Sequence, residues 1–287
     1  MTAPPLLQRA VKDATRRSSR RTSAPALRSA ATIAMLSPMF ELTGLPPRGW
    51  STRVPPGRRI YAIGDIHGRD DLLRELHRRI IDDRASLAPD CRPVVIYLGD
   101  YVDRGPGSLE VIDMLLNEPL TGFERVYLMG NHERMMLDFL NGPPDPVWLF
   151  NGGTATLWSY GVSGRSLTSE RDLEHLRSCL IEAVPSTHRG FLDSLSFSHE
   201  EGDYLFVHAG VRPGRPLDRQ EPQDLLWIRG PFLHSETDFG RRIVHGHTIT
   251  PEPVVARNRI GIDTGAFYSG RLTCAVLEDT QLRFLHT

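Results

Sequence analysis

The stretch RRIYAIGDIHGRD, Arg58 to Asp70, decides the fold of this chain. An apolar, strand-like run stops at a glycine and continues directly into Asp65, Ile66 and His67. Burying a carboxylate and an imidazole costs several kcal/mol unless both groups find partners. A metal ion is one partner that would explain them. A simple turn, formed where an aspartate stands among glycines, is the other explanation.

Four further runs of the same kind follow along the chain. PVVIYLGD ends at Asp100, ERVYLMGN ends at Asn131 with His132 next to it, DYLFVH ends at His208, and IVHGH ends at His247. Each run alone is typical of a turn or of a structural histidine, but the five together are hard to explain as turns. We therefore expect buried strands whose carboxyl ends bring these polar side chains to one place.

Amphipathic segments separate the strand-like runs. Apolar residues recur at helical spacing over Asp70 to Asp83 and over Ser108 to Asn117, and a third helix is expected directly after Asn131. The chain then stays largely helical to about Ser194 and becomes strand-like again in its last third. Alternating strands and helices predict an α/β (α+β) fold with a parallel component.

The predicted organisation is one catalytic domain behind a tail. Residues 58–287 form the domain, with a helical insert at about 141–194, and no linker divides it. Residues 1–57 are rich in Arg, Ser, Ala and Pro and poor in acidic residues, which predicts a disordered segment. An export or targeting signal is the alternative interpretation of the arginines.

Composition argues against several classes of protein. The chain has 287 residues, 40% hydrophobic content and a formal net charge of -1, so it lacks the overall positive charge of nucleic-acid-binding proteins. Its 3 cysteines stand far apart without a C-x-x-C pair, which argues against disulfides and thiolate zinc sites. No apolar run approaches the roughly 20 residues needed to span a bilayer. We expect a cytoplasmic protein with no nucleic-acid or membrane partner, while the sequence does not indicate its oligomeric state.

The polar residues at the strand ends fit a divalent metal centre. Carboxylate, amide and imidazole ligands without thiolates suit Mn²⁺, Fe or Zn²⁺. A carboxylate shared between two ions about 3.5–4 Å apart is the arrangement used for in-line displacement at phosphorus. The sequence therefore predicts two metal ions and phosphoryl chemistry.

Five short motifs carry a resemblance to a known family. GDIHG, GDYVDRG, GNHE, HAG and GHT occur in the order found in PPP-type metallophosphatases of the calcineurin-like phosphoesterase superfamily. WLFNGG, LLWIR and IDTGA resemble, more closely, bacterial serine/threonine protein phosphatases and bacteriophage lambda phosphatase. The similarity covers roughly Arg58 to Leu285. It implies a two-sheet β-sandwich flanked by helices, with a dinuclear metal site at the carboxyl ends of strands.

The resemblance also implies a set of metal ligands. One ion would be held by Asp65, His67 and Asp100. The other ion would share Asp100 and add Asn131, His208 and His247. The expected ions are two Mn²⁺, with Fe, Zn²⁺ or Mg²⁺ as alternatives, and hydrolysis would proceed by direct attack of a metal-bridging hydroxide. Gly64 and Gly68 are expected to let the backbone pass close to the ions.

The family pattern assigns roles to four more residues. His132 would protonate the leaving alkoxide as general acid, and Asp103 would orient its imidazole. Arg104 and Arg229 would bind phosphate oxygens, since the forked guanidinium group matches the geometry of two oxygens of a phosphate.

Several neighbouring residues leave alternatives open. His245 competes with His247 within HGHT, and only the family pattern selects His247. Arg212 is a further candidate for anion binding, and a solvent-facing role is the alternative for Arg229. Glu133 is expected to cap or brace the helix that follows it.

The resemblance favours a phosphatase acting on phosphoserine or phosphothreonine in proteins, so a phosphoprotein or phosphopeptide is the expected partner. The first alternative is symmetrical hydrolysis of dinucleoside polyphosphates, but that sister group typically has alanine at the position of Asp103 and aspartate at that of Glu133. The second alternative is a scaffold that binds phosphoprotein without turnover, which would be expected to lack a ligand or the general acid.

Overall fold

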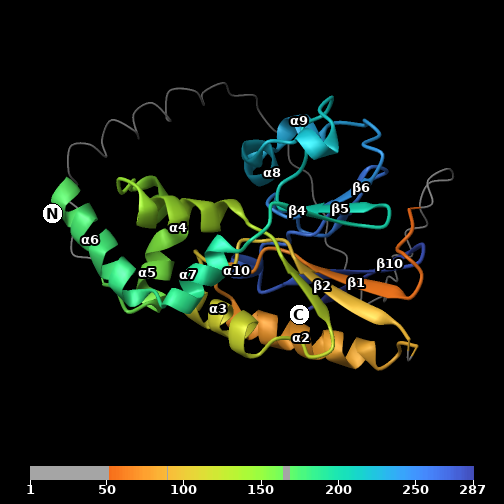
Figure 1. Cartoon of the computed structure of the whole chain (residues 1–287), viewed down its shortest axis with the longest axis horizontal. Helices are drawn as coiled ribbons and strands as arrows, with labels where there is room; N and C mark the ends of the chain where they lie inside the picture. The colour runs from red at the N-terminus through yellow and green to blue at the C-terminus, as the bar shows by residue number, and fades with distance from the viewer. Residues whose placement is uncertain (1–51, 89, 164–168) are drawn as a thin grey trace, which may run out of the picture. The chain divides into compact units, whose positions relative to one another are not determined.

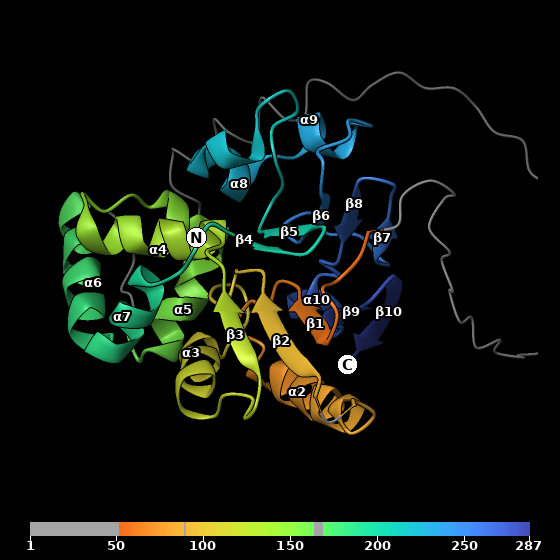
Figure 2. The same ribbon diagram turned by 45° about the vertical axis from the view of Figure 1, so that its right-hand side comes forward.

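The computed structural model describes residues 52–88, 90–163 and 169–287, so residues 1–51 of the predicted tail lie outside the described range. Within that range, two five-stranded sheets pack against each other and helices cover their outer faces (Figure 1 and Figure 2). The predicted α/β fold, a two-sheet sandwich flanked by helices, is confirmed.

The first sheet is built from the strands β1 (Arg58–Ile63), β2 (Arg92–Tyr97), β3 (Glu124–Tyr127), β9 (Thr273–Glu278) and β10 (Gln281–His286). Their spatial order is β10-β9-β1-β2-β3. β1, β2 and β3 run parallel, whereas β9 is antiparallel to both of its neighbours. Because β1 and β2 are paired from their first to their last residues, their polar continuations emerge at the same edge.

β3 is shorter and less buried than the sequence predicts. ERVYLMGN predicts a buried strand, but β3 covers only Glu124–Tyr127 at the edge of the sheet, and no residue in it is fully buried. An edge strand has a neighbour on one side only, which explains the exposure. The chain still reaches the common edge, because the Leu128 amide donates to the Tyr97 carbonyl.

Alternation along the central strands produces two separate cores. Ile60 and Ala62 of β1 face the second sheet, and Tyr61 and Ile63 face the helices. All four side chains are fully buried. Both faces of the sheet are therefore covered, as expected for parallel strands that are apolar throughout.

The second sheet is built from the strands β4 (Ser198–Glu201), β5 (Tyr204–Val207), β6 (Arg242–His245), β7 (Val254–Val255) and β8 (Arg259–Gly261). Its order is β4-β5-β6-β8-β7, with β5, β6 and β8 parallel. Tyr204, Phe206 and Val244 project into the core between the sheets. The carboxyl ends of β5 and β6 lead directly into His208 and His247.

The helices are α2 (Asp70–Arg84), α3 (Ser108–Asn117), α4 (Asn131–Asn141), α5 (Thr154–Ser159), α6 (Glu170–Ala183), α7 (Ser186–Asp193), α8 (Pro222–Trp227), α9 (Gly230–Leu233) and α10 (Ala266–Ser269). Two further helical turns of other types are η2 (Leu149–Gly153) and η3 (Leu217–Arg219). α2 and α3 pack on the first sheet, and α8 and α9 pack on the second. The segment between α4 and β4 carries η2, α5, α6 and α7 (Figure 2).

The folded domain begins before the predicted boundary at residue 58. Val54 is buried in the core between the sheets, and its amide donates to the carbonyl of Asp279. The Arg53 amide donates to the Asp203 carboxylate. The segment from Thr52 to Gly57 is thus part of the sandwich, although its composition resembles that of the tail.

Candidate metal centre

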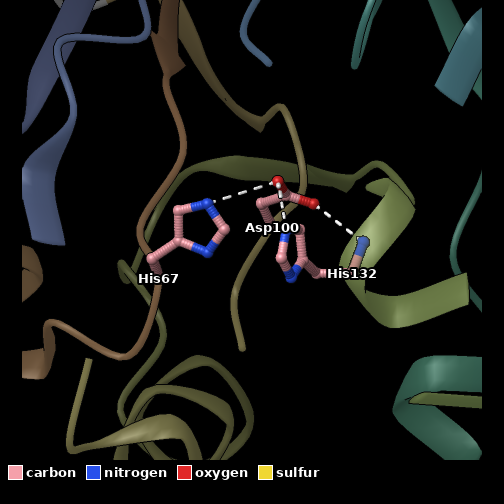
Figure 3. Close-up of side chains that lie close together, drawn as sticks. All are labelled: His67, Asp100 and His132. Atoms are coloured by element: carbon pink, nitrogen blue, oxygen red, sulfur yellow. Dashed lines mark hydrogen bonds and ion pairs between the residues drawn. The ribbon is translucent and has the colours of Figure 1, made fainter. Parts of the chain in front are cut away.

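Asp100 lies at the centre of a buried cluster of imidazoles. Its Oδ2 lies 3.4 Å from Nε2 of His67 and 3.9 Å from Nε2 of His132, and its Oδ1 lies 3.5 Å from Nε2 of His208. Figure 3 shows the rings of His67 and His132 on two sides of the carboxylate. These side chains come from the ends of β1, β2 and β5 and the start of α4, as the sequence predicts.

The ring nitrogens that face Asp100 carry lone pairs. Nδ1 of His67 lies 2.9 Å from the carbonyl of Val102, and Nδ1 of His208 lies 2.9 Å from the carbonyl of Leu98. A carbonyl only accepts, so Nδ1 must be the protonated nitrogen in both rings. Nε2 of each ring is left as an electron-pair donor directed at the cluster.

A second group adjoins the first on the side of His208. Nε2 of His208 lies 2.9 Å from Oδ1 of Asn131 and 3.2 Å from Nδ1 of His247. Asp100, His208 and His247 are grouped closely enough to hold one ion, and His67, Asp100 and His132 form the other such group. His245, in contrast, binds the carbonyl of Gly246 and lies outside both groups of the described residues.

Asp65 lies beside these groups rather than inside them. Both of its carboxylate oxygens accept from the backbone amide of His247, at 3.1 and 3.0 Å. Asp263, from IDTGA, lies next to it: burial first, and then the charges of Asp263 and Asp100, raise the pKa of Asp65 well above its ordinary value. The proximity of Asp263 was not anticipated from the sequence, although its motif was noted.

Backbone strain gathers at the same residues. Among the described residues other than glycine, six have positive φ, and five of them are site candidates: His67 at 47°, Asp100 at 52°, Asp103 at 73°, Arg104 at 69° and His247 at 61°. Each such conformation costs about 1–3 kcal/mol and persists only where the surroundings enforce it. The fold therefore holds these side chains in place at the expense of local backbone preference.

Glycines allow the two carboxylates to approach the neighbouring backbone. A Cβ at Gly130 would lie 2.1 Å from Oδ1 of Asp100, and a Cβ at Gly246 would lie 2.0 Å from Oδ1 of Asp65. Gly64 and Gly68, expected to let the backbone pass close to the ions, make room for the carbonyls of Ile262 and Gly105.

Asp103 is a buried carboxylate that receives several hydrogen bonds. Its Oδ2 lies 2.7 Å from Nδ1 of His132 and accepts from Nε1 of Trp148 at 2.9 Å. Its Oδ1 accepts from the hydroxyl of Thr156 at 2.6 Å. The predicted contact with His132 is present, whereas Trp148 and Thr156 were not anticipated. Trp148 at least lies in the noted WLFNGG motif.

The surroundings of His132 favour its charged form. Burial alone would lower the pKa of His132, but the carboxylates of Asp100 and Asp103 raise it above the ordinary value. Burial would likewise raise the pKa of Asp100, and four nearby imidazoles hold it far below the ordinary value instead. These shifts favour a protonated His132 beside an ionised Asp100.

Replacing Trp148 with phenylalanine should weaken the support of Asp103. The variant keeps the packing against Phe139 but loses the indole donor, and a hydrogen bond to a charged group contributes about 1.5–3 kcal/mol to stability. On the expectation that His132 acts as the general acid, kcat for an alkyl phosphate should fall by roughly tenfold, a part of what such an acid supplies. Kinetics on alkyl and activated aryl phosphates check this, and equal losses on both would contradict an action through His132.

The two arginines assigned to phosphate lie on different sides of the cluster. Nη1 of Arg104 donates to Nε2 of His67 at 2.8 Å, and the guanidinium stands 5.0 Å above the ring of Phe267. Arg229 is exposed, and its Nη1 donates to Thr248 at 3.3 Å. Its charge lowers the pKa of His208, after the larger effect of burial, which indicates that it lies near that ring.

Arg212 and Glu133 have partners of their own. Arg212 was a candidate for anion binding. Its Nε donates to the carboxylate of Asp224 at 2.7 Å, so the guanidinium is already paired with an anionic group of the protein. Glu133 accepts from the amides of Gly130 and Asp100, at 2.9 and 2.8 Å. It braces the start of α4, as expected, and also fixes the loop that carries Asp100.

The family can now be stated from a direct comparison. The model of the calcineurin-like phosphoesterase family matches residues 58–269. The chain belongs to this family. The predicted resemblance is thereby confirmed, and the chain is a metallophosphoesterase, a hydrolase of a family that uses divalent metal ions.

Relatives with two different names each match about three quarters of this chain. Serine/threonine-protein phosphatase 2 of Escherichia coli is 30% identical over 224 residues, which cover 75% of this chain and 91% of the relative. An asymmetrical bis(5'-nucleosyl)-tetraphosphatase, PrpE of Oceanobacillus iheyensis, is 29% identical over 234 residues, covering 75% and 87%. The crystal structure of a cold-active protein-tyrosine phosphatase from a psychrophilic Shewanella species aligns with a TM-score of 0.52 at 18% identity, covering 82% of each chain, and supports the fold.

The side chains present fit the divalent ions that the family uses. Neutral imidazoles with inward lone pairs, a shared carboxylate and an amide oxygen are suitable ligands for first-row ions, and no thiolate takes part. Asp100, His208, His247 and Asn131 would hold one ion. His67 and Asp100 would hold the other, to which the family pattern adds Asp65 although its carboxylate lies beside the group and accepts from the amide of His247. Separately, no helix among the described residues is both long and apolar enough to cross a membrane.

Proposed function

We propose that this metallophosphoesterase removes phosphate from phosphoserine and phosphothreonine in proteins. The observation that supports this most is the buried pair of His132 and Asp103, separated by 2.7 Å. A serine or threonine alkoxide is a strongly basic leaving group and must be protonated as it departs. Cleavage of a dinucleoside polyphosphate releases a weakly basic phosphate anion, which has little need of such an acid.

The residues of the chain divide the task between them. Nδ1 of His132 is held by Asp103, which leaves Nε2 to give its proton to the leaving oxygen. Arg104 and Arg229 bind phosphate oxygens from the two sides of Asp100. When bound, the divalent ions would supply Lewis-acid stabilisation of the phosphoryl group and a water nucleophile activated at neutral pH.

The ring positions that would hold the ions are fixed by the backbone. The carbonyls of Val102 and Leu98 set the tautomers of His67 and His208, so both rings keep their lone pairs directed inward. Mn²⁺ is the ion we propose for the test below, because it suits a site of carboxylate, amide and imidazole ligands.

Initial rates on four substrates test the proposal. Phosphoserine, phosphothreonine and phosphotyrosine peptides are compared with diadenosine tetraphosphate, with Mn²⁺ present throughout. We expect kcat/KM for the phosphoserine and phosphothreonine peptides to exceed that for the dinucleotide by at least about tenfold, since the acid gains most for alkoxides. Faster cleavage of the dinucleotide would reject the proposal in favour of the activity named for the PrpE relative.

A further inference from the structure

Arg104 is held along its whole length, from its backbone to its guanidinium. Its amide donates to the carbonyl of Gly152 at 3.1 Å, and its φ is 69°. A Cβ at Gly152 would lie 2.7 Å from Cγ of Arg104, so the stem of the side chain runs closely over that glycine. The guanidinium stands 5.0 Å above the ring of Phe267, and its Nη1 donates to His67 at 2.8 Å. The charged end of the side chain therefore lies between the metal centre and an aromatic ring.

An aromatic partner leaves the guanidinium available for a ligand. Arg59, an arginine with a structural role, is paired with carboxylates instead: its Nε and Nη2 donate to Glu278, and its Nη1 donates to Asp83. Arg104 forms no such ion pair with a carboxylate in the part of the chain that the structure describes. A cation over the face of a ring is attracted by the quadrupole of the ring, so its N–H donors are not given up to an acidic residue. Arg104 thus keeps donors and charge for an anion.

Phe267 is itself held in place by its neighbours. Its ring stands edge to face with the ring of His67 at 5.5 Å and with the ring of Tyr268 at 5.1 Å. The carbonyl of Ala266, directly before it in α10, accepts from Nη1 of Arg69 at 3.0 Å. Phe267 is therefore fixed through its ring and through the adjoining backbone, and it can serve as a rigid support for the guanidinium.

We propose that Phe267 is a positioning residue that holds the guanidinium of Arg104 ready to bind phosphate; this rests on the proposed function, in which Arg104 binds phosphate oxygens. A freely rotating arginine loses side-chain entropy when it binds a ligand. A guanidinium already held over a ring has lost that freedom beforehand, so preorganisation increases the affinity. The effect should appear in phosphate binding rather than in metal binding, because the carbonyl of Val102 fixes the tautomer of His67 independently of Phe267.

Phe267→Leu tests the proposal, since it removes the aromatic face and keeps an apolar side chain at this position. With Mn²⁺ present, the dissociation constant for inorganic phosphate, measured by calorimetry, should rise about three- to tenfold, the range expected for one cation–π contact. KM for para-nitrophenyl phosphate should rise by a similar factor, with a smaller change in kcat. Phe267→Tyr keeps the ring and should bind phosphate as the unaltered protein does.

Tyr268→Leu supplies the matched control. Tyr268 is the next residue on α10 and is 62% exposed, and its ring contacts Phe267, whereas the ring over Arg104 is that of Phe267. The same change of an aromatic residue to leucine should therefore affect phosphate binding much less at this position. The metal content of every variant, measured by mass spectrometry, should equal that of the unaltered protein.

Arg104→Ala separates this inference from the proposed function. The variant should bind phosphate more weakly, and adding Phe267→Leu to it should cause no further loss, because the ring acts through Arg104. Unchanged phosphate binding in Arg104→Ala rejects the role of Arg104 and the inference together.

Two other outcomes reject only the role of Phe267. One is normal phosphate binding in Phe267→Leu, or an equal further loss when this change is added to Arg104→Ala. The other is a lower metal content in Phe267→Leu, which would assign the effect to the contact with His67. Because the probe is inorganic phosphate, the result does not depend on whether a phosphopeptide or a dinucleotide is the better substrate.

Discussion

Replacing His208 or His247 with alanine should lower kcat for a phosphothreonine peptide by at least about a thousandfold, or about 4 kcal/mol of transition-state stabilisation. Nε2 of His208 lies within 3.5 Å of Asp100, Asn131 and His247, so its removal takes away the atom on which one group of ligands converges. The metal content of the purified variants, measured by mass spectrometry, should fall below that of the unaltered protein. Activity is measured with Mn²⁺ added in excess.

His245→Ala is the control for this loss. His245 is buried like His247 and lies two residues before it, but it binds the carbonyl of Gly246 and stands outside both ligand groups. The variant should keep its metal content and most of its activity per folded molecule. An inverse result, with His245 essential and His247 dispensable, would reverse the assignment made from HGHT. Activity that survives both chelation and His208→Ala would exclude metal catalysis.

Local patterns predicted the strands and their polar ends, except that β3 is a shorter and less buried edge strand than expected. The run from Ile60 to Ile63 is apolar throughout, a property of neighbouring residues that predicts a strand buried on both faces, as β1 is. The convergence on Asp100 followed from a rule about parallel sheets rather than from any one motif. For this reason the five short runs, each of them ambiguous alone, together predicted where the polar cluster lies in the fold.

Contacts between distant segments were beyond the reach of such patterns. Trp148 and Thr156 follow Asp103 by 45 and 53 residues. Their spacing in the sequence does not predict that they donate hydrogen bonds to Asp103. The proximity of Asp263 to Asp65 likewise depends on how the strands assemble. The insert was recognised as helical, whereas its use as a support for the candidate acid required the three-dimensional structure.

Replacing His132 with asparagine should separate substrates by their leaving groups. A general acid contributes roughly 10²–10⁴-fold, so we expect a loss of that size with a phosphoserine peptide and less than about tenfold with an activated aryl phosphate. Burial lowers the pKa of His132, but the carboxylates of Asp100 and Asp103 raise it above its ordinary value, which favours the protonated form. In the unaltered protein, activity on the phosphopeptide should fall as the pH rises through this pKa, and the variant should lack that alkaline limb.

The metal content of His132→Asn decides between two roles for this ring. Nε2 of His132 lies 3.9 Å from Asp100, close enough for His132 to share a ligand group with His67. A ligand that is lost should reduce bound metal and slow every substrate alike. A lost acid should leave metal binding intact and slow only substrates with basic leaving groups. The hydrogen bond of Nδ1 to Asp103 orients the ring in either case, so the ratio of the two rates, rather than either rate alone, identifies the proton donor.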